Sequence, residues 1–273
     1  MTKRRQRILR KTLAILSLFL IFFVGHETYG LTLHNKSYFS GWTLAGLIGI
    51  LTAYSIRKKI SVLPIGAATS WLQFHVYLGL LSGLVFATHI DWSIPTGWFE
   101  ILLGAMFSSL FLSGVVGYYL DRHLPPLLTR RGEEVIFERI PGFMAELRRS
   151  AEDISIKCAT ETGSSTLSEH YIEHLAPFFS QPNKLLSHLR GSNRGFANTL
   201  RELDNMDRYL NDAERKFASQ LRELATKKDD LDHQYALQIT LKGWLLFHVP
   251  LAYSTVLLML LHVVLAYAFG GGI

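Results

Sequence analysis

The sequence predicts an all-α membrane protein: five transmembrane helices form a bundle, and a helical, coiled-coil-like insertion separates the fourth from the fifth. Hydrophobic residues make up 49% of the 273 residues and charged residues only 18%. The hydrophobic residues gather in long runs, and a membrane-spanning helix needs about 20 consecutive apolar residues. Between the last two runs lies a long polar stretch with helical periodicity, which predicts the insertion.

Five apolar runs are candidates for these spans. The first two are shorter or richer in glycine, whereas the last three are long and continuous. The predicted spans cover residues 12–27, 40–56, 71–90, 98–120 and 241–268. The chain then divides into residues 1–120 with spans one to four, 121–239 as the insertion, and 240–273 with the fifth span.

The basic residues predict how the spans run. The formal net charge is +6, and most of the excess lies at Lys3-Arg4-Arg5 and Arg57-Lys58-Lys59, beside predicted spans, whereas residues 121–239 are slightly acidic. Basic residues flank the cytoplasmic ends of spans. We therefore expect an integral protein of a bacterial inner membrane, with a cytoplasmic N-terminus, residues 121–239 in the cytoplasm and an external C-terminus. The basic balance reflects topology, so no nucleic-acid partner is expected.

The cysteine content excludes several kinds of redox centre. Cys158 is the single cysteine, so an internal disulfide, an iron–sulfur cluster, a cysteine-based zinc site and covalent c-type haem attachment are ruled out. The sequence also contains no Walker A motif, no G-x-G-x-x-G motif and no nucleophile elbow. Nucleotide or flavin chemistry within this chain is therefore not expected.

Four histidines lie inside two of the predicted spans. His75 and His89 are 14 positions apart in span three, and His248 and His262 are 14 positions apart in span five. In an α-helix, 14 residues return to within about 40° of the same face and rise roughly 21 Å. Ionisable residues at membrane depth are costly and mark functional sites.

The predicted topology pairs these histidines by level. Spans three and five both run outward, so His75 should face His248 on the cytoplasmic side, and His89 should face His262 on the external side. Two imidazoles on facing helices can supply both axial ligands of a haem. Zinc would need four ligands, and spans three and five contain no Cys, Asp or Glu.

We therefore predict two stacked, non-covalent b haems with bis-histidine ligation. Gly79 and Gly83 lie between the two histidines of span three, where small residues would offer a flat surface to the cofactor. The alternative for any one histidine is a hydrogen bond between helices, and small residues in spans also serve plain helix packing.

The H-x13-H pair on two co-oriented spans resembles the bis-haem core of transmembrane b-type cytochromes. This class includes cytochrome b of quinol–cytochrome c reductases and the transmembrane domain of ferric reductases and NADPH oxidases. Placement on spans three and five is closer to the second group. Two departures stand out: the oxidases' sixth span and flavin domain are absent, and residues 121–239 are inserted between the haem-bearing spans. The resemblance implies that a separate molecule donates the electrons.

The remaining histidines are weaker candidates. His26 and His34 lie near the predicted external end of span one and could line an outer haem or substrate site, and His123 follows span four and could lie near the inner haem. Solvation is the usual state at such positions and is what we expect. His170 and His174 are one helical turn apart and could bind a metal. Without a third ligand in view, we expect both to be solvated.

The insertion contains two helical segments. Apolar residues at helical spacing cover 130–158, and from about residue 196 a long helix is expected to run without a break into span five. Its heptad seam consists of Leu203, Leu210, Phe217, Leu224 and Leu231. An antiparallel hairpin that packs 130–158 on 196–238 would cover this seam. A second copy or a redox partner is the alternative.

The function that follows is transmembrane electron transfer between partners on opposite membrane faces. Two imidazoles per iron leave no open position for chemistry at the metal. We expect separate redox donor and acceptor proteins, or a quinone, as partners, with the chain acting as a homo-oligomer or as a subunit of a larger complex. A quinol-oxidising or quinone-reducing subunit is one alternative. A non-redox signalling or scaffold protein that acts through the coiled-coil region is the other.

Overall fold

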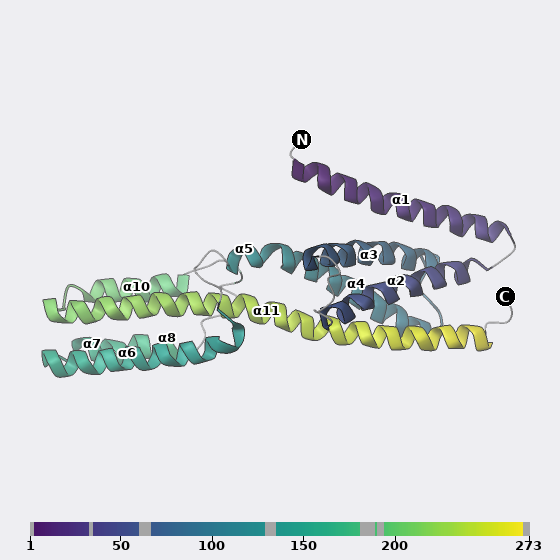
Figure 1. The fold of residues 1–273 in the computed structure, drawn as a ribbon. Helices are drawn as coiled ribbons and strands as arrows, with labels where there is room; N and C mark the ends of the chain where they lie inside the picture. The colour runs from purple at the N-terminus through teal and green to yellow at the C-terminus, as the bar shows by residue number, and fades with distance from the viewer. Residues whose placement is uncertain are drawn as a thin grey trace. The chain divides into compact units, whose positions relative to one another are not determined.

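The computed structural model describes residues 3–32, 35–59, 67–128, 135–180, 189 and 194–269. These residues are almost entirely helical and contain no strand (Figure 1). The chain divides into two compact units, Met1–Tyr119 with Trp244–Ile273, and Leu120–Gly243. We call these the bundle unit and the insertion unit and describe each separately.

The bundle unit consists of long apolar helices. Helices α1, α2, α3 and α4 span Lys3–Leu31, Lys36–Lys59, Ala68–His89 and Trp98–His123, and the C-terminal part of α11, Asp212–Phe269, completes the unit. A helix satisfies its own backbone hydrogen bonds, which membrane insertion requires. Among the described residues, four helical segments are long and apolar enough to cross a membrane: Leu9–Leu31, Ala68–His89, Trp98–Leu128 and Asp212–Phe269.

The predicted all-α membrane fold is therefore supported, but with four candidate spans. The second predicted span, residues 40–56, does form a helix within α2. This helix is not among the four apolar segments. Its role as a fifth span stays a prediction.

The bundle unit has a small interior and a large apolar exterior. Its buried cluster consists of Phe22, Leu44, Ile48, Leu81, Val85 and Phe107. Many large apolar side chains point outward instead, including Ile21, Leu112, Leu257 and Val264, each of which is at least 62% exposed. A soluble protein rarely exposes so much apolar surface, which is typical of a lipid-facing exterior.

Glycines allow close contacts between helices of this unit. A Cβ atom at Gly83 would collide with the Phe111 ring of α4, and a Cβ atom at Gly117 would collide with the Trp244 ring of α11. The Trp244 indole N–H also donates to the Ser113 carbonyl at 2.9 Å. Small residues at helix interfaces are typical of membrane bundles.

The insertion unit is built from shorter helices and the N-terminal part of α11. Its elements are α5 (Pro125–Leu128), the 3₁₀-helix η1 (Phe137–Arg139), α6 (Ile140–Thr162), α7 (Thr166–His170), the π-helix η2 (Tyr171–Leu175), α8 (Ala176–Ser180) and α10 (Arg194–Met206). Gly163 caps the C-terminus of α6. Its φ of 66° is the left-handed conformation that glycine adopts without strain.

The expectation of one unbroken helix from residue 196 was wrong. Helix α10 ends at Met206, and α11 begins at Asp212 after a turn. The Asn211 side chain accepts from the Glu214 backbone N–H at 2.8 Å, and the Glu214 carboxylate accepts from the Asn211 N–H at 2.7 Å. This reciprocal capping box begins a new helix. From there α11 runs on for 58 residues to Phe269.

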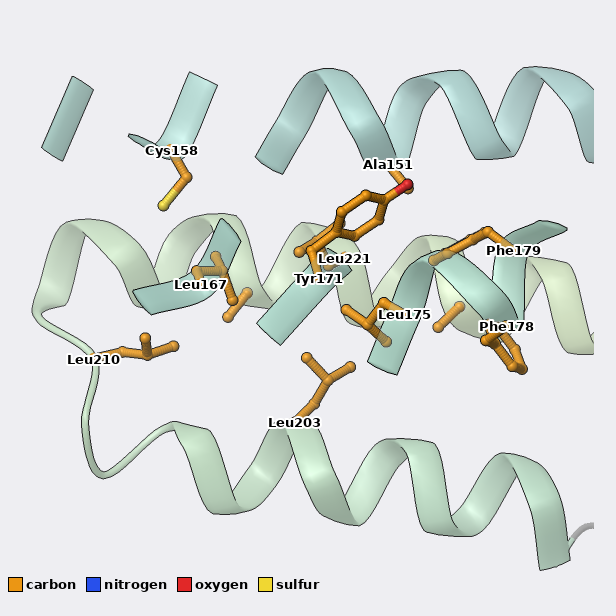
Figure 2. Packing of buried hydrophobic residues seen from close by; sticks show 12 residues of the cluster. Ala151, Cys158, Leu167, Tyr171, Leu175, Phe178, Phe179, Leu203, Leu210 and Leu221 are labelled. Atoms are coloured by element: carbon orange, nitrogen blue, oxygen red, sulfur yellow. The ribbon is translucent and has the colours of Figure 1, made fainter. Parts of the chain in front are cut away.

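The heptad residues cover an intramolecular core. Leu203 of α10 and Leu210 of the turn that follows α10 are buried in the same cluster as Leu221 of α11 (Figure 2). Phe217 and Leu224 pack against this cluster. The segment from α6 to α8 contributes further members, among them Ala151, Cys158, Leu167 and Leu175. The packing agrees with the predicted intramolecular arrangement rather than with a seam that needs another chain.

We expect Asn211→Ala to destabilise the start of α11 by about 1 kcal/mol, because the Glu214 backbone N–H loses its side-chain acceptor. Hydrogen exchange of the amides in the first turn of α11 should accelerate several-fold, and exchange near Leu221 should change less. Glu214→Gln keeps an acceptor at the same position and serves as the control. Unchanged exchange in the alanine variant would show that the capping box does not set this boundary.

Candidate functional site

Helices α3 and α11 place the four predicted histidines. His75 lies in the second turn of α3 and His89 is its last residue, while His248 and His262 lie in the part of α11 that belongs to the bundle unit. The rings of His89 and His262 have centroids 6.3 Å apart and planes at 89°. The structure thus brings His89 of α3 close to His262 of α11, and His75 and His248 lie on the same two helices.

The His89/His262 separation suits a metal held between the two rings. An imidazole nitrogen binds a metal ion at about 2.0–2.1 Å, so two imidazoles on opposite sides of one ion have centroids roughly 6 Å apart. Axial ligation does not restrict the angle between the two ring planes. Two imidazoles are the donor pair that bis-histidine haem uses. The carboxylates of Asp91 and Glu100 also line the adjoining cavity.

A cavity of about 840 Å³ adjoins these two rings. Its volume lies within the range of small-molecule and cofactor sites, about 300–1,000 Å³. The walls are mostly apolar and come from α2, α3, the α3–α4 loop, α4 and α11. Besides the two histidines, the lining includes Trp42, Phe99, Phe107, Thr255 and Met259.

Neighbouring side chains hold the four rings in two different ways. His89 Nδ1 lies 3.0 Å from the Ser40 hydroxyl, and His248 Nδ1 lies 3.1 Å from the Ser113 hydroxyl. Ring contacts are also made: His248 stacks on Trp244 with centroids 5.0 Å apart and planes at 26°. His262 stacks on Phe99 with centroids 6.3 Å apart and planes at 22°, and the His75 ring lies 5.1 Å from the Tyr54 ring.

The two predicted glycines differ in their surroundings. Gly83 lies directly beneath the Phe111 ring, so its missing side chain makes room for α4. At Gly79, a Cβ atom would meet no described atom within 4 Å. A flat surface for a cofactor on α3 therefore stays a prediction, with Gly79 the more open of the two positions.

The prediction that His26 is solvated was wrong. Its side chain is only 4% exposed and packs against Phe22 and Phe39, with ring centroids 5.8 and 6.5 Å away. His26 follows Phe22 by four residues and therefore shares the face of α1 that packs on α2. That spacing was the available signal. His34 lies outside the described residues, and His123 is exposed as expected.

In the insertion unit, His174 is exposed as predicted, but His170 is half-buried. Their rings lie 4.8 Å apart, and burial together with His174 lowers the pKa of His170. In the described part of the chain, no group of three or more His, Cys, Asp or Glu residues could hold a metal ion. The pair therefore offers no built metal site there.

Ser40 and Ser113 are the site residues that sequence reasoning missed. Each is followed by a glycine, Gly41 or Gly114, within an apolar helix. The repeated Ser-Gly dipeptide was a visible signal, although nothing in one helix reveals which neighbour the hydroxyl meets. No family model, curated protein or solved structure matches the chain. Any assignment of function therefore depends on the geometry of the site itself.

Proposed function

We propose that this chain is a membrane electron-transfer protein that holds two non-covalent b haems, one at the His89/His262 pair and one at the His75/His248 pair. The observation that carries the proposal is the His89/His262 geometry: two imidazoles at the separation of axial ligands, beside a cavity of cofactor size. The identical 14-residue interval in α3 and α11 extends the same arrangement to the second pair.

The chain's own residues position the cofactors and exclude water. The four imidazoles would hold the two haems, two imidazoles to each iron. Haem supplies one-electron chemistry when it is bound. The interval of 14 residues separates the two sites by roughly 21 Å along the helices. Such a separation suits a relay across a bilayer whose hydrocarbon core is about 30 Å thick.

The resemblance to bis-haem transmembrane cytochromes supports the same function. Because the chain has no nucleotide-binding motif, we propose that a separate redox protein or a quinone delivers the electrons and that another accepts them. The chain would then work in the lipid membrane as a homo-oligomer or as a subunit of a larger complex. The orientation, with residues 121–239 on the cytoplasmic side, stays a prediction from the basic clusters.

An optical spectrum of the purified protein tests the proposal. We expect a Soret band and a pyridine haemochrome of the b type, with two haems per chain. A chain that binds no haem would contradict electron transfer and favour the signalling or scaffold alternative. Two haems that quinol analogues reduce directly would assign the partner as a quinone. One haem per chain would contradict the two-site relay.

A further inference from the structure

Two Ser-Gly dipeptides touch the histidine pairs in equivalent ways. Ser40 of α2 meets Nδ1 of His89, and Ser113 of α4 meets Nδ1 of His248. In both cases the following glycine lies against the Cε1 atom of the same imidazole. One histidine of each pair therefore contacts a serine hydroxyl and the backbone of the glycine that follows it.

The surroundings of Ser40 determine which nitrogen of His89 carries the proton. The Ser40 hydroxyl lies 3.1 Å from the Lys36 carbonyl and 3.3 Å from the Ser37 carbonyl, and these oxygens can only accept. The hydroxyl hydrogen therefore goes to α2, and an oxygen lone pair faces His89. Ser40 is fully buried, so no solvent competes for this lone pair. His89 must then donate from Nδ1, which leaves Nε2 with its lone pair.

The two glycines differ in how much room an added side chain would have beside the imidazole. A Cβ atom at position 41 would lie 3.1 Å from His89 Cε1, closer than side chains normally approach. At position 114 it would lie 3.8 Å from His248 Cε1, which is an ordinary van der Waals contact. A methyl group at Gly41 would push the His89 ring away from Ser40, whereas one at Gly114 would be accommodated.

We infer that Ser40 and Gly41 are positioning residues that hold His89 as the Nδ1–H tautomer and present Nε2 as a metal ligand, and that the Ser113 hydroxyl positions the ring of His248. This inference rests on the proposed haem function. A hydrogen bond from the far ring nitrogen fixes the tautomer and raises the basicity of the ligand, and loss of such a partner typically weakens metal binding about 10- to 100-fold.

Haem content and redox titration of the full-length protein test this inference. Ser40→Ala should weaken binding of one haem about 10- to 100-fold. It should also raise the midpoint potential of that haem, because a less basic imidazole stabilises the ferric state less. The second haem should be unchanged. Ser40→Thr keeps the hydroxyl and should restore both values towards those of the natural protein. Ser113→Ala should affect the other haem alone.

The two glycines provide a matched control. Gly41→Ala should reproduce the effect of Ser40→Ala, and Gly114→Ala should leave both haems as they are. Two haems with unchanged affinities and potentials in Ser40→Ala would overturn the positioning role and leave the proposed function intact. If the natural protein binds no haem, the proposed function fails instead. The tautomer is then read by ¹⁵N NMR of His89, where a proton on Nε2 would overturn the inference by itself.

Discussion

His89→Ala should remove one of the two haems and leave the other, and His262→Ala should remove the same one. The ring centroids of these two residues lie 6.3 Å apart, and in the proposed arrangement both imidazoles would hold the same iron, so the loss of either one should weaken that haem's binding. The other pair lies roughly 21 Å away along the helices and keeps both ligands. The double variant should therefore lose little more than either single variant, whereas His75→Ala combined with His262→Ala should lose both haems. Haem titration by difference spectra measures this pattern.

His26→Ala is the control for this series. His26 is also a buried histidine of the bundle unit, but it packs against Phe22 and Phe39 rather than beside a second imidazole. We expect it to retain both haems. Equal loss from every pairwise combination of the four histidines would mean that they form one site or maintain the fold, and the two-site relay would then be rejected.

Leu221→Ala should destabilise the insertion unit by about 2–5 kcal/mol, because a fully buried leucine leaves a cavity in the cluster of Figure 2. Cys158 reports this change directly. It is the single cysteine of the chain, it is buried in the same cluster, and burial raises the pKa of its thiol, so it reacts only when the unit opens. A maleimide should label the variant at least about 30-fold faster, since 1.4 kcal/mol is a factor of ten in an equilibrium constant.

Ile156→Ala is the control. This side chain belongs to α6, the helix that contains Cys158, but it is 56% exposed. Its labelling rate should stay close to that of the natural protein, as surface substitutions usually change stability by less than about 0.5 kcal/mol. Equal labelling of Cys158 in the Leu221 variant and in the natural protein would show that the cluster around Leu221 is not the stabilising core of this unit.

The sequence alone determined the helical architecture, because apolar runs and 3.6-residue periodicity act within one segment. It also determined that the two histidines of α3, and the two of α11, are 14 positions apart. Helical geometry then states which face of the helix they share and how far apart they lie along it. The break before α11 also has a local cause. Asn211 and Glu214 form a capping box that begins a new helix, although the heptad pattern continues through this point. The Asn-x-x-Glu spacing of this capping box is visible in the sequence.

Contacts between helices far apart in the chain were decided only by the tertiary structure. His26 looked like a solvated residue until α2 was seen to cover the face it shares with Phe22. The hydroxyl of Ser40 meets a ring 49 positions away, and that of Ser113 meets one 135 positions away. Periodicity states which face of a helix a residue occupies but not which neighbour lies opposite. Hydrogen bonds of about 3 Å depend on how two helices approach each other, which only their packed side chains determine.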